Sequence, residues 1–262
     1  MSLQALIFDV DGTIADTETV HREAFNRAFR AHGLDWHWDR QLYAELLQVT
    51  GGKERIAKYL ERRDAAGFDG AHRAPLIAAL HATKTKLYHE LLERTEVPAR
   101  PGVWRLMNEA LAANVRLAIA STTSVENIEP VLKSIFGREA LHWFSAIATG
   151  DMVRRKKPAP DVYQTALELL QLDAAAAIAI EDSAIGVQAA KAAGLYTVAT
   201  PNPWTETQDF SSADLVLSSL EDAAESLAAQ VDARIGVRYS GLAQLASLHA
   251  AALSDGTRPC PS

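Results

Sequence analysis

Two aspartates close to the N-terminus follow a short apolar run, in the sequence Asp9-Val10-Asp11-Gly12-Thr13. Two carboxylates at the end of a buried strand are costly unless a positive charge compensates for their lost hydration. A divalent hard cation is the natural counter-charge, and Mg²⁺ binds a few carboxylates together with water and phosphate oxygens. The alternative is an ordinary Asp-Gly turn in which Asp11 only caps the loop. We therefore consider metal-assisted chemistry at Asp9 and Asp11.

Three further polar motifs occur later in the chain. Ser121 ends the run Leu-Ala-Ile-Ala and could bind an anion ahead of a helix, although ordinary helix capping by Thr123 or Ser124 is the favoured explanation of this stretch taken alone. Lys157 closes a run of four basic residues before a proline; it could neutralise a phosphoryl group or lie in a solvated loop. Glu181 and Asp182 follow another apolar run and repeat the logic of the first motif. Helix capping by one acid would not explain why both acids are present.

Four short apolar runs precede polar residues, which is typical of parallel strands covered on both faces. Helical patterns of about a dozen residues separate the later runs. The pattern predicts a doubly wound α/β sheet whose ligands bind beyond the carboxyl ends of the strands. The predicted strands are 5–10, 117–120, 146–148 and 177–180, with 195–198 and 215–217 as further candidates. The predicted helices are 103–113, 125–136, 161–170, 184–193 and 221–229, with 241–253 as an outer amphipathic helix.

One segment breaks this alternation. From about Thr17 to Arg94 the apolar residues recur at helical spacing, and no strand candidate occurs. We expect an inserted small α-helical cap over the strand ends, with the chain returning to the sheet through a turn at 99–102. The predicted division is residues 1–16 and 95–230 as the catalytic core, 17–94 as the cap and 231–262 as a C-terminal extension. That extension is expected to hold one helix and a frayed tail.

The composition excludes several classes of partner. The 262-residue chain carries a net charge of −7, which disfavours nucleic acid and anionic membranes. Its single cysteine, Cys260, allows no internal disulfide, and no stretch of membrane-spanning length or signal peptide is recognised. We expect a monomeric, cytoplasmic protein with a small phosphorylated substrate, which binds neither nucleic acid nor membranes.

The four motifs together resemble the haloacid dehalogenase superfamily of phosphohydrolases, over roughly residues 3 to 222. The resemblance implies that Asp9 attacks phosphorus and that Asp11 first protonates the leaving alcohol and then activates water. It further implies phosphoryl contacts from Ser121 and Lys157. The implied cofactor is Mg²⁺, held by Asp9, the Asp11 carbonyl and Asp182, with Glu181 as a further or outer ligand.

The stretches DTETVHREAF, QVTGGKERIAKYL and TKTKLYHELL resemble the CbbY-like branch of this superfamily. Members of that branch act as xylulose-1,5-bisphosphate phosphatases associated with carbon fixation, so the resemblance implies this substrate. Each implied substrate residue also has an ordinary structural explanation, such as a helix start or a core aromatic. The implied substrate-binding residues are Glu18, His21, Tyr43, Gly52, Lys53, Lys84, Thr123 and Ser124.

Several alternatives stay open from the sequence. Thr17, His21 and Lys84 are shared with β-phosphoglucomutases, although Gly51-Gly52 replaces their arginine-bearing loop. A phosphoglycolate phosphatase-like hydrolase is a further possibility. A receiver-type signalling domain is disfavoured by the helical cap, a non-catalytic sugar-phosphate binder by the full set of acids, and dehalogenation by the second acid of the first motif.

Overall fold

The computed structural model describes residues 2–63, 70–221 and 241–254. Six parallel strands form one sheet in the order β3-β2-β1-β4-β5-β6. Strand β1 lies between β2 and β4, with Ala5 opposite both Arg116 and Ala177. The predicted doubly wound parallel sheet is therefore confirmed. The strands are β1 (Ala5–Phe8), β2 (Arg116–Ala120), β3 (Phe144–Ala148), β4 (Ala177–Glu181), β5 (Tyr196–Ala199) and β6 (Leu215–Val216).

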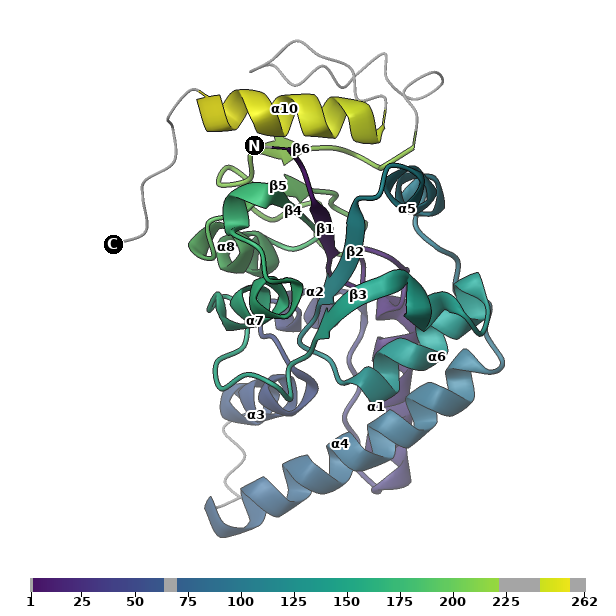
Figure 1. The fold of residues 1–262 in the computed structure, drawn as a ribbon. Coiled ribbons are helices and arrows are strands. Elements are labelled where there is room, and N and C mark those ends of the chain that lie inside the picture. The colour runs from purple at the N-terminus through teal and green to yellow at the C-terminus, as the bar shows by residue number, and fades with distance from the viewer. Residues whose placement is uncertain (1, 64–69, 222–240, 255–262) are drawn as a thin grey trace.

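Side chains alternate along the strands and build a core on each face of the sheet. In β1, Leu6 and Phe8 pack into one apolar cluster, while Ala5 and Ile7 pack into the other. Helices α5 and α6 cover the first face, and α7 and α8 cover the second (Figure 1). Burial on both faces explains why the strands are apolar throughout. These helices are α5 (Val103–Ala112), α6 (Val125–Phe136), α7 (Asp161–Leu170) and α8 (Ala184–Ala192).

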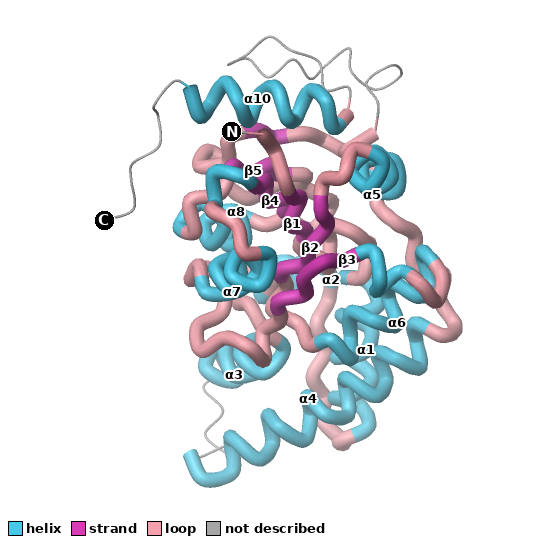
Figure 2. The backbone as a smooth tube through the Cα atoms, in the orientation of Figure 1, coloured by secondary structure: helices cyan, strands magenta, loops and turns pink. Residues whose placement is uncertain are grey.

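The segment that follows β1 is helical, as predicted, and lies beyond the carboxyl ends of the strands (Figure 2). Its aromatic residues form a separate apolar cluster around Phe25, Phe29 and Trp38. The chain returns through a turn at 101–102 that leads directly into α5. Among the described residues of this segment, the helices are α1 (Glu18–Ala31), α2 (Arg40–Leu46), α3 (Gly52–Arg62) and α4 (Gly70–Leu92). The exact domain boundaries given above stay a prediction.

The C-terminal extension contains α10 (Leu242–Ser254), close to the predicted range. Its first residue is tied to α5, because the Leu242 backbone N–H donates to Glu109 Oε2 over 2.8 Å. Leu242 and Leu245 join the core cluster on that face of the sheet. The predicted helix 221–229, apart from Glu221, and the predicted tail after Ser254 lie outside the described residues. No helix within the described ranges is both long and apolar enough to cross a membrane.

Candidate active site

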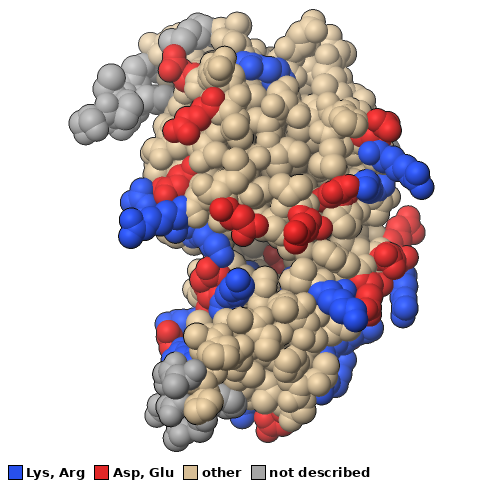
Figure 3. Space-filling view, turned by 60° about the horizontal axis from the view of Figure 1, so that its bottom comes forward, with Lys and Arg blue, Asp and Glu red and all other residues tan. Residues whose placement is uncertain are grey.

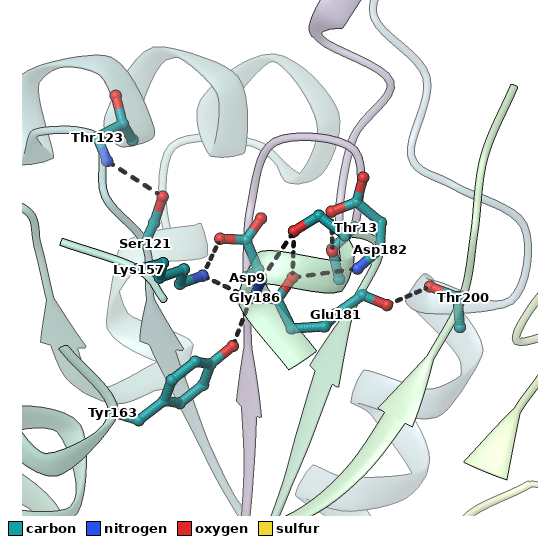
Figure 4. A network of polar contacts seen from close by, with 11 residues as sticks. Asp9, Thr13, Ser121, Thr123, Lys157, Tyr163, Glu181, Asp182, Gly186 and Thr200 are labelled. Carbon is teal, nitrogen blue, oxygen red and sulfur yellow. Dashed lines mark hydrogen bonds and ion pairs between the residues drawn. The ribbon is translucent and has the colours of Figure 1, made fainter. Parts of the chain in front are cut away.

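The polar residues of the four motifs meet at the carboxyl edge of the sheet (Figure 4). Asp9 directly follows β1, and its backbone N–H continues the ladder to Ile180 by a 3.0 Å hydrogen bond. Ser121 follows β2, while Glu181 ends β4 and Asp182 comes next. Parallel strands in register end at the same edge, which is why positions more than 100 residues apart come together.

Lys157 is the positive centre of this group. Its Nζ donates to Asp9 Oδ1 and to Glu181 Oε1, each over 2.6 Å, and its side chain is buried. Burial favours the neutral amine, but the charges of Asp9 and Glu181 outweigh it and raise the Lys157 pKa. The lysine therefore stays charged. Of the basic run 154–157, the structure brings this residue to Asp9 and Glu181.

Glu181 is saturated by donors from the chain itself. Its Oε1 accepts from Lys157 and from the Tyr163 hydroxyl over 2.7 Å; its Oε2 accepts from the Asp182 backbone N–H and the Ser183 hydroxyl, both over 3.2 Å. The absence of a side chain at Gly186 makes room for this carboxylate, since a Cβ there would lie 2.0 Å from Glu181 Cδ. Glu181 therefore serves first to hold Lys157.

Three buried acids face each other with one lysine among them. One carboxylate oxygen each of Asp9, Glu181 and Asp182 lies within 4.8 Å of the other two. Burial, only partly offset by Lys157, raises the pKa of Asp9. Burial and the charges of Asp9 and Glu181 likewise raise the pKa of Asp182. The excess negative charge and the oxygen-only donor set fit a hard divalent cation.

The Asp11 side chain points away from that group, toward the helical region. Thr17 donates to its Oδ1 over 2.6 Å, and His21 Nε2 lies 3.0 Å from the same oxygen. Burial alone would raise the Asp11 pKa, but His21, Thr17 and Lys84 together lower it to about 2. As a metal ligand, Asp11 was predicted to act through its backbone carbonyl, and that assignment stays a prediction.

Gly12 follows Asp11 in a tight turn that passes close to Asp182. Its φ of +85° lies in the region open to glycine, and a Cβ would approach Asp182 Oδ2 to 2.3 Å. Thr13, next in the chain, donates from Oγ1 to Asp182 Oδ1 over 3.1 Å. A residue of the first motif, Thr13, thus makes a direct hydrogen bond to Asp182 of the fourth motif.

A pocket connects this group to the helical region. Figure 3 shows acidic and basic side chains around a hollow between two lobes. On the side of its ring opposite Asp11, His21 contacts Lys84, whose Nζ lies 2.7 Å from His21 Nδ1. Tyr88 stacks on the His21 ring, with 4.1 Å between the ring centroids. The predicted residues that line the pocket are Asp9, Asp11, Glu18, His21, Gly52, Lys53, Lys84, Ser121, Thr123, Ser124, Lys157 and Asp182.

Tyr43 and Glu181 are the predicted residues that do not line the pocket. Tyr43 is fully buried and donates to Glu18 Oε2 over 2.6 Å, so it can act on a ligand only through the pocket residues that it contacts, such as Glu18. Ser124 is the N-cap residue of α6 and makes no side-chain cap hydrogen bond. Its Oγ accepts from Asn127 Nδ2 over 3.3 Å, Ser121 Oγ accepts from the Thr123 backbone N–H over 3.3 Å, and both serines line the pocket.

Sequence reasoning missed several pocket residues, among them Arg55, His81, Asn127 and Lys156. His81 precedes Lys84 by one helical turn, so helix periodicity could have found it. Lys156 could have been found as the neighbour of Lys157; its Nζ donates to Glu54 Oε1 over 2.7 Å. Arg55 binds the Tyr43 hydroxyl over 3.0 Å, and no local pattern indicates that contact.

Comparisons with known proteins agree with this geometry. The family model for haloacid dehalogenase-like hydrolases matches residues 3–194. Protein CbbY of Rhodobacter capsulatus is 48% identical over 224 residues, which cover 86% of this chain and 96% of the relative. CbbY from Rhodobacter sphaeroides, as a variant in complex with xylulose 1,5-bisphosphate, is 44% identical with a TM-score of 0.78. The match covers 85% of this chain and 96% of that one.

The β-phosphoglucomutase of Clostridium difficile has a TM-score of 0.72 over 96% of this chain and 99% of its own. At 18% identity this likeness shows the fold alone. The family match includes all four motifs of the site, and the identity to CbbY extends over most of the chain. The chain is therefore an enzyme that belongs to the haloacid dehalogenase-like hydrolase family.

Proposed function

We propose that this enzyme is a magnesium-dependent phosphatase that acts on a small sugar bisphosphate, with xylulose 1,5-bisphosphate as the leading substrate. The observation that carries the proposal is the Asp9 carboxylate at the pocket, paired with Lys157 and adjoining the acidic group. The substrate assignment is supported by the bisphosphate complex of CbbY from Rhodobacter sphaeroides.

The donor set fits Mg²⁺, which carboxylates and carbonyl oxygens bind in proteins. Asp9, Asp182 and the Asp11 carbonyl would hold it, whereas Glu181 is engaged by four hydrogen-bond donors and would lie outside. When bound, the cation supplies positive charge to the phosphoryl oxygens. Ser121 and Lys157 would contact the same oxygens from the chain.

In the first step, an Asp9 oxygen attacks phosphorus, and the bond from phosphorus to the sugar oxygen breaks to leave an aspartyl-phosphate. Asp11 would give a proton to the departing alcohol, and because its pKa before substrate binds is about 2, it must take up that proton as the substrate binds. The phosphoryl charge close to Asp11 raises its pKa and favours this acid form. In the second step, Asp11 takes a proton from water, which attacks phosphorus and releases phosphate with Asp9 restored.

The testing experiment is Mg²⁺-dependent phosphate release from xylulose 1,5-bisphosphate, ribulose 1,5-bisphosphate, β-glucose 1-phosphate and phosphoglycolate. We expect preference for the first substrate and no release by Asp9→Asn, with its fold verified by circular dichroism. Turnover by Asp9→Asn at the wild-type rate would refute the mechanism. Consumption of β-glucose 1-phosphate without phosphate release would identify a mutase, and preference for phosphoglycolate would replace the substrate class. Monomeric state, cytoplasmic location and a link to carbon fixation stay predictions.

A further inference from the structure

Asn202, which lies three residues beyond the end of β5, is buried beside the acidic group. Its Nδ2 donates to Asp182 Oδ2 over 2.7 Å and to the Gly12 carbonyl over 3.3 Å. The other oxygen of Asp182 accepts from Thr13, so donors fix both ends of this carboxylate. The hydrogen bond to Asp182 Oδ2 thus comes from a residue outside the four motifs.

The direction of the Asn202 amide is set by its neighbour. The Trp204 backbone N–H, which can only donate, meets Asn202 Oδ1 over 2.8 Å and therefore leaves Nδ2 to face Asp182. The loop is closed by two further bonds, from the Asn202 N–H to Thr205 Oγ1 over 3.0 Å and from the Thr205 N–H to the Asn202 carbonyl over 2.9 Å. The asparagine is thus held in one orientation before any ligand binds.

Trp204 anchors this loop in the helical region. Its indole is buried in the aromatic cluster of α1, α2 and α3. The Tyr43 ring meets it edge-on at 5.5 Å, and the Arg40 guanidinium lies 4.5 Å above it. Arg40 also donates to the Pro203 carbonyl over 3.2 Å. Since Tyr43 holds Glu18, contiguous contacts run from the acidic group to a wall of the pocket.

We infer that Asn202 is a positioning residue for Asp182, and that Trp204 ties this pair to the helices that line the substrate pocket. The inference rests on the cation site proposed above. Removing an outer partner that orients a metal ligand typically weakens metal binding about 10- to 100-fold. The loop after β5 thereby sets the magnesium affinity of the site, although neither side chain needs to touch the cation.

The test is calorimetric titration of Mg²⁺ into the full-length wild-type protein and into Asn202→Ala, Trp204→Phe and Asn108→Ala. Asn108 lies exposed on α5, where its amide donates to the Trp104 carbonyl, and serves as the matched control. We expect the magnesium Kd to rise about 10- to 100-fold in Asn202→Ala. It should rise by a smaller factor in Trp204→Phe and stay unchanged in Asn108→Ala. Excess magnesium should restore turnover in Asn202→Ala, which a purely structural defect would not allow.

Circular dichroism establishes which variants are folded. A folded Asn202→Ala with the wild-type magnesium Kd would overturn the inference. If that variant does not fold, Trp204→Phe decides, and an unchanged Kd there has the same meaning. Failure of the wild-type protein to bind magnesium at all would instead remove the proposed cation site, so the two failures are distinguishable.

Discussion

Replacement of Tyr163 by phenylalanine isolates one hydrogen bond in the buried network. The Tyr163 hydroxyl is one of four donors to the Glu181 carboxylate, which is fully buried. Phenylalanine keeps the ring and its packing and removes only this donor. A hydrogen bond to a charged group is worth about 1.5–3 kcal/mol, so we expect Tyr163→Phe to lower the free energy of unfolding by about 2 kcal/mol. For a chain of this size that corresponds to a fall in Tm of about 4–8 °C.

Urea unfolding at neutral pH, followed by circular dichroism, measures this difference. Tyr59→Phe is the matched control, because the Tyr59 ring is also buried but its hydroxyl accepts from Arg63, whose side chain is 41% exposed. The control should change stability by less than about 0.5 kcal/mol. If Tyr163→Phe is as stable as the control, Glu181 does not depend on its full set of donors. The reasoning that the four donors together stabilise the buried Glu181 carboxylate would then be refuted.

Two further predictions concern the helical region. Burial, partly opposed by the charge of Asp11, lowers the pKa of Lys84 from 10.5 to about 8, so the unfolded chain binds more protons between these values. The unfolding free energy of the wild type relative to Lys84→Met should therefore rise by about 2 kcal/mol from about pH 7.5 to 9.5 in urea titrations; a constant difference would contradict the shift. Lys53→Ala and Tyr43→Phe should reduce kcat/KM for sugar bisphosphates more than for an aryl phosphate. Equal losses on both substrates would remove these residues from substrate recognition.

Most motif residues were predictable because they come at or directly after the end of a run of strand-like residues, whereas Lys157 was singled out by the basic run before a proline. Asp9, Ser121 and Asp182 follow β1, β2 and β4, and parallel pairing alone brings such positions to one edge. Asn202 also follows a strand, yet a lone asparagine after 196–199 carries no chemical signature of its own. Tyr163 lies on the inner face of α7, where its spacing indicates only a core residue.

The sequence by itself determined the order of strands and helices, the helical insertion and the acids that gather at the sheet edge. Local periodicity and strand ends encode these features directly. Only the tertiary structure decided that the Glu181 carboxylate accepts four hydrogen bonds from other groups of the chain. It also decided that Tyr43 donates to Glu18, and that Trp204 joins the loop after β5 to the helical region. Such contacts depend on side-chain packing between segments far apart in the chain, and no local pattern of residues specifies which atoms meet.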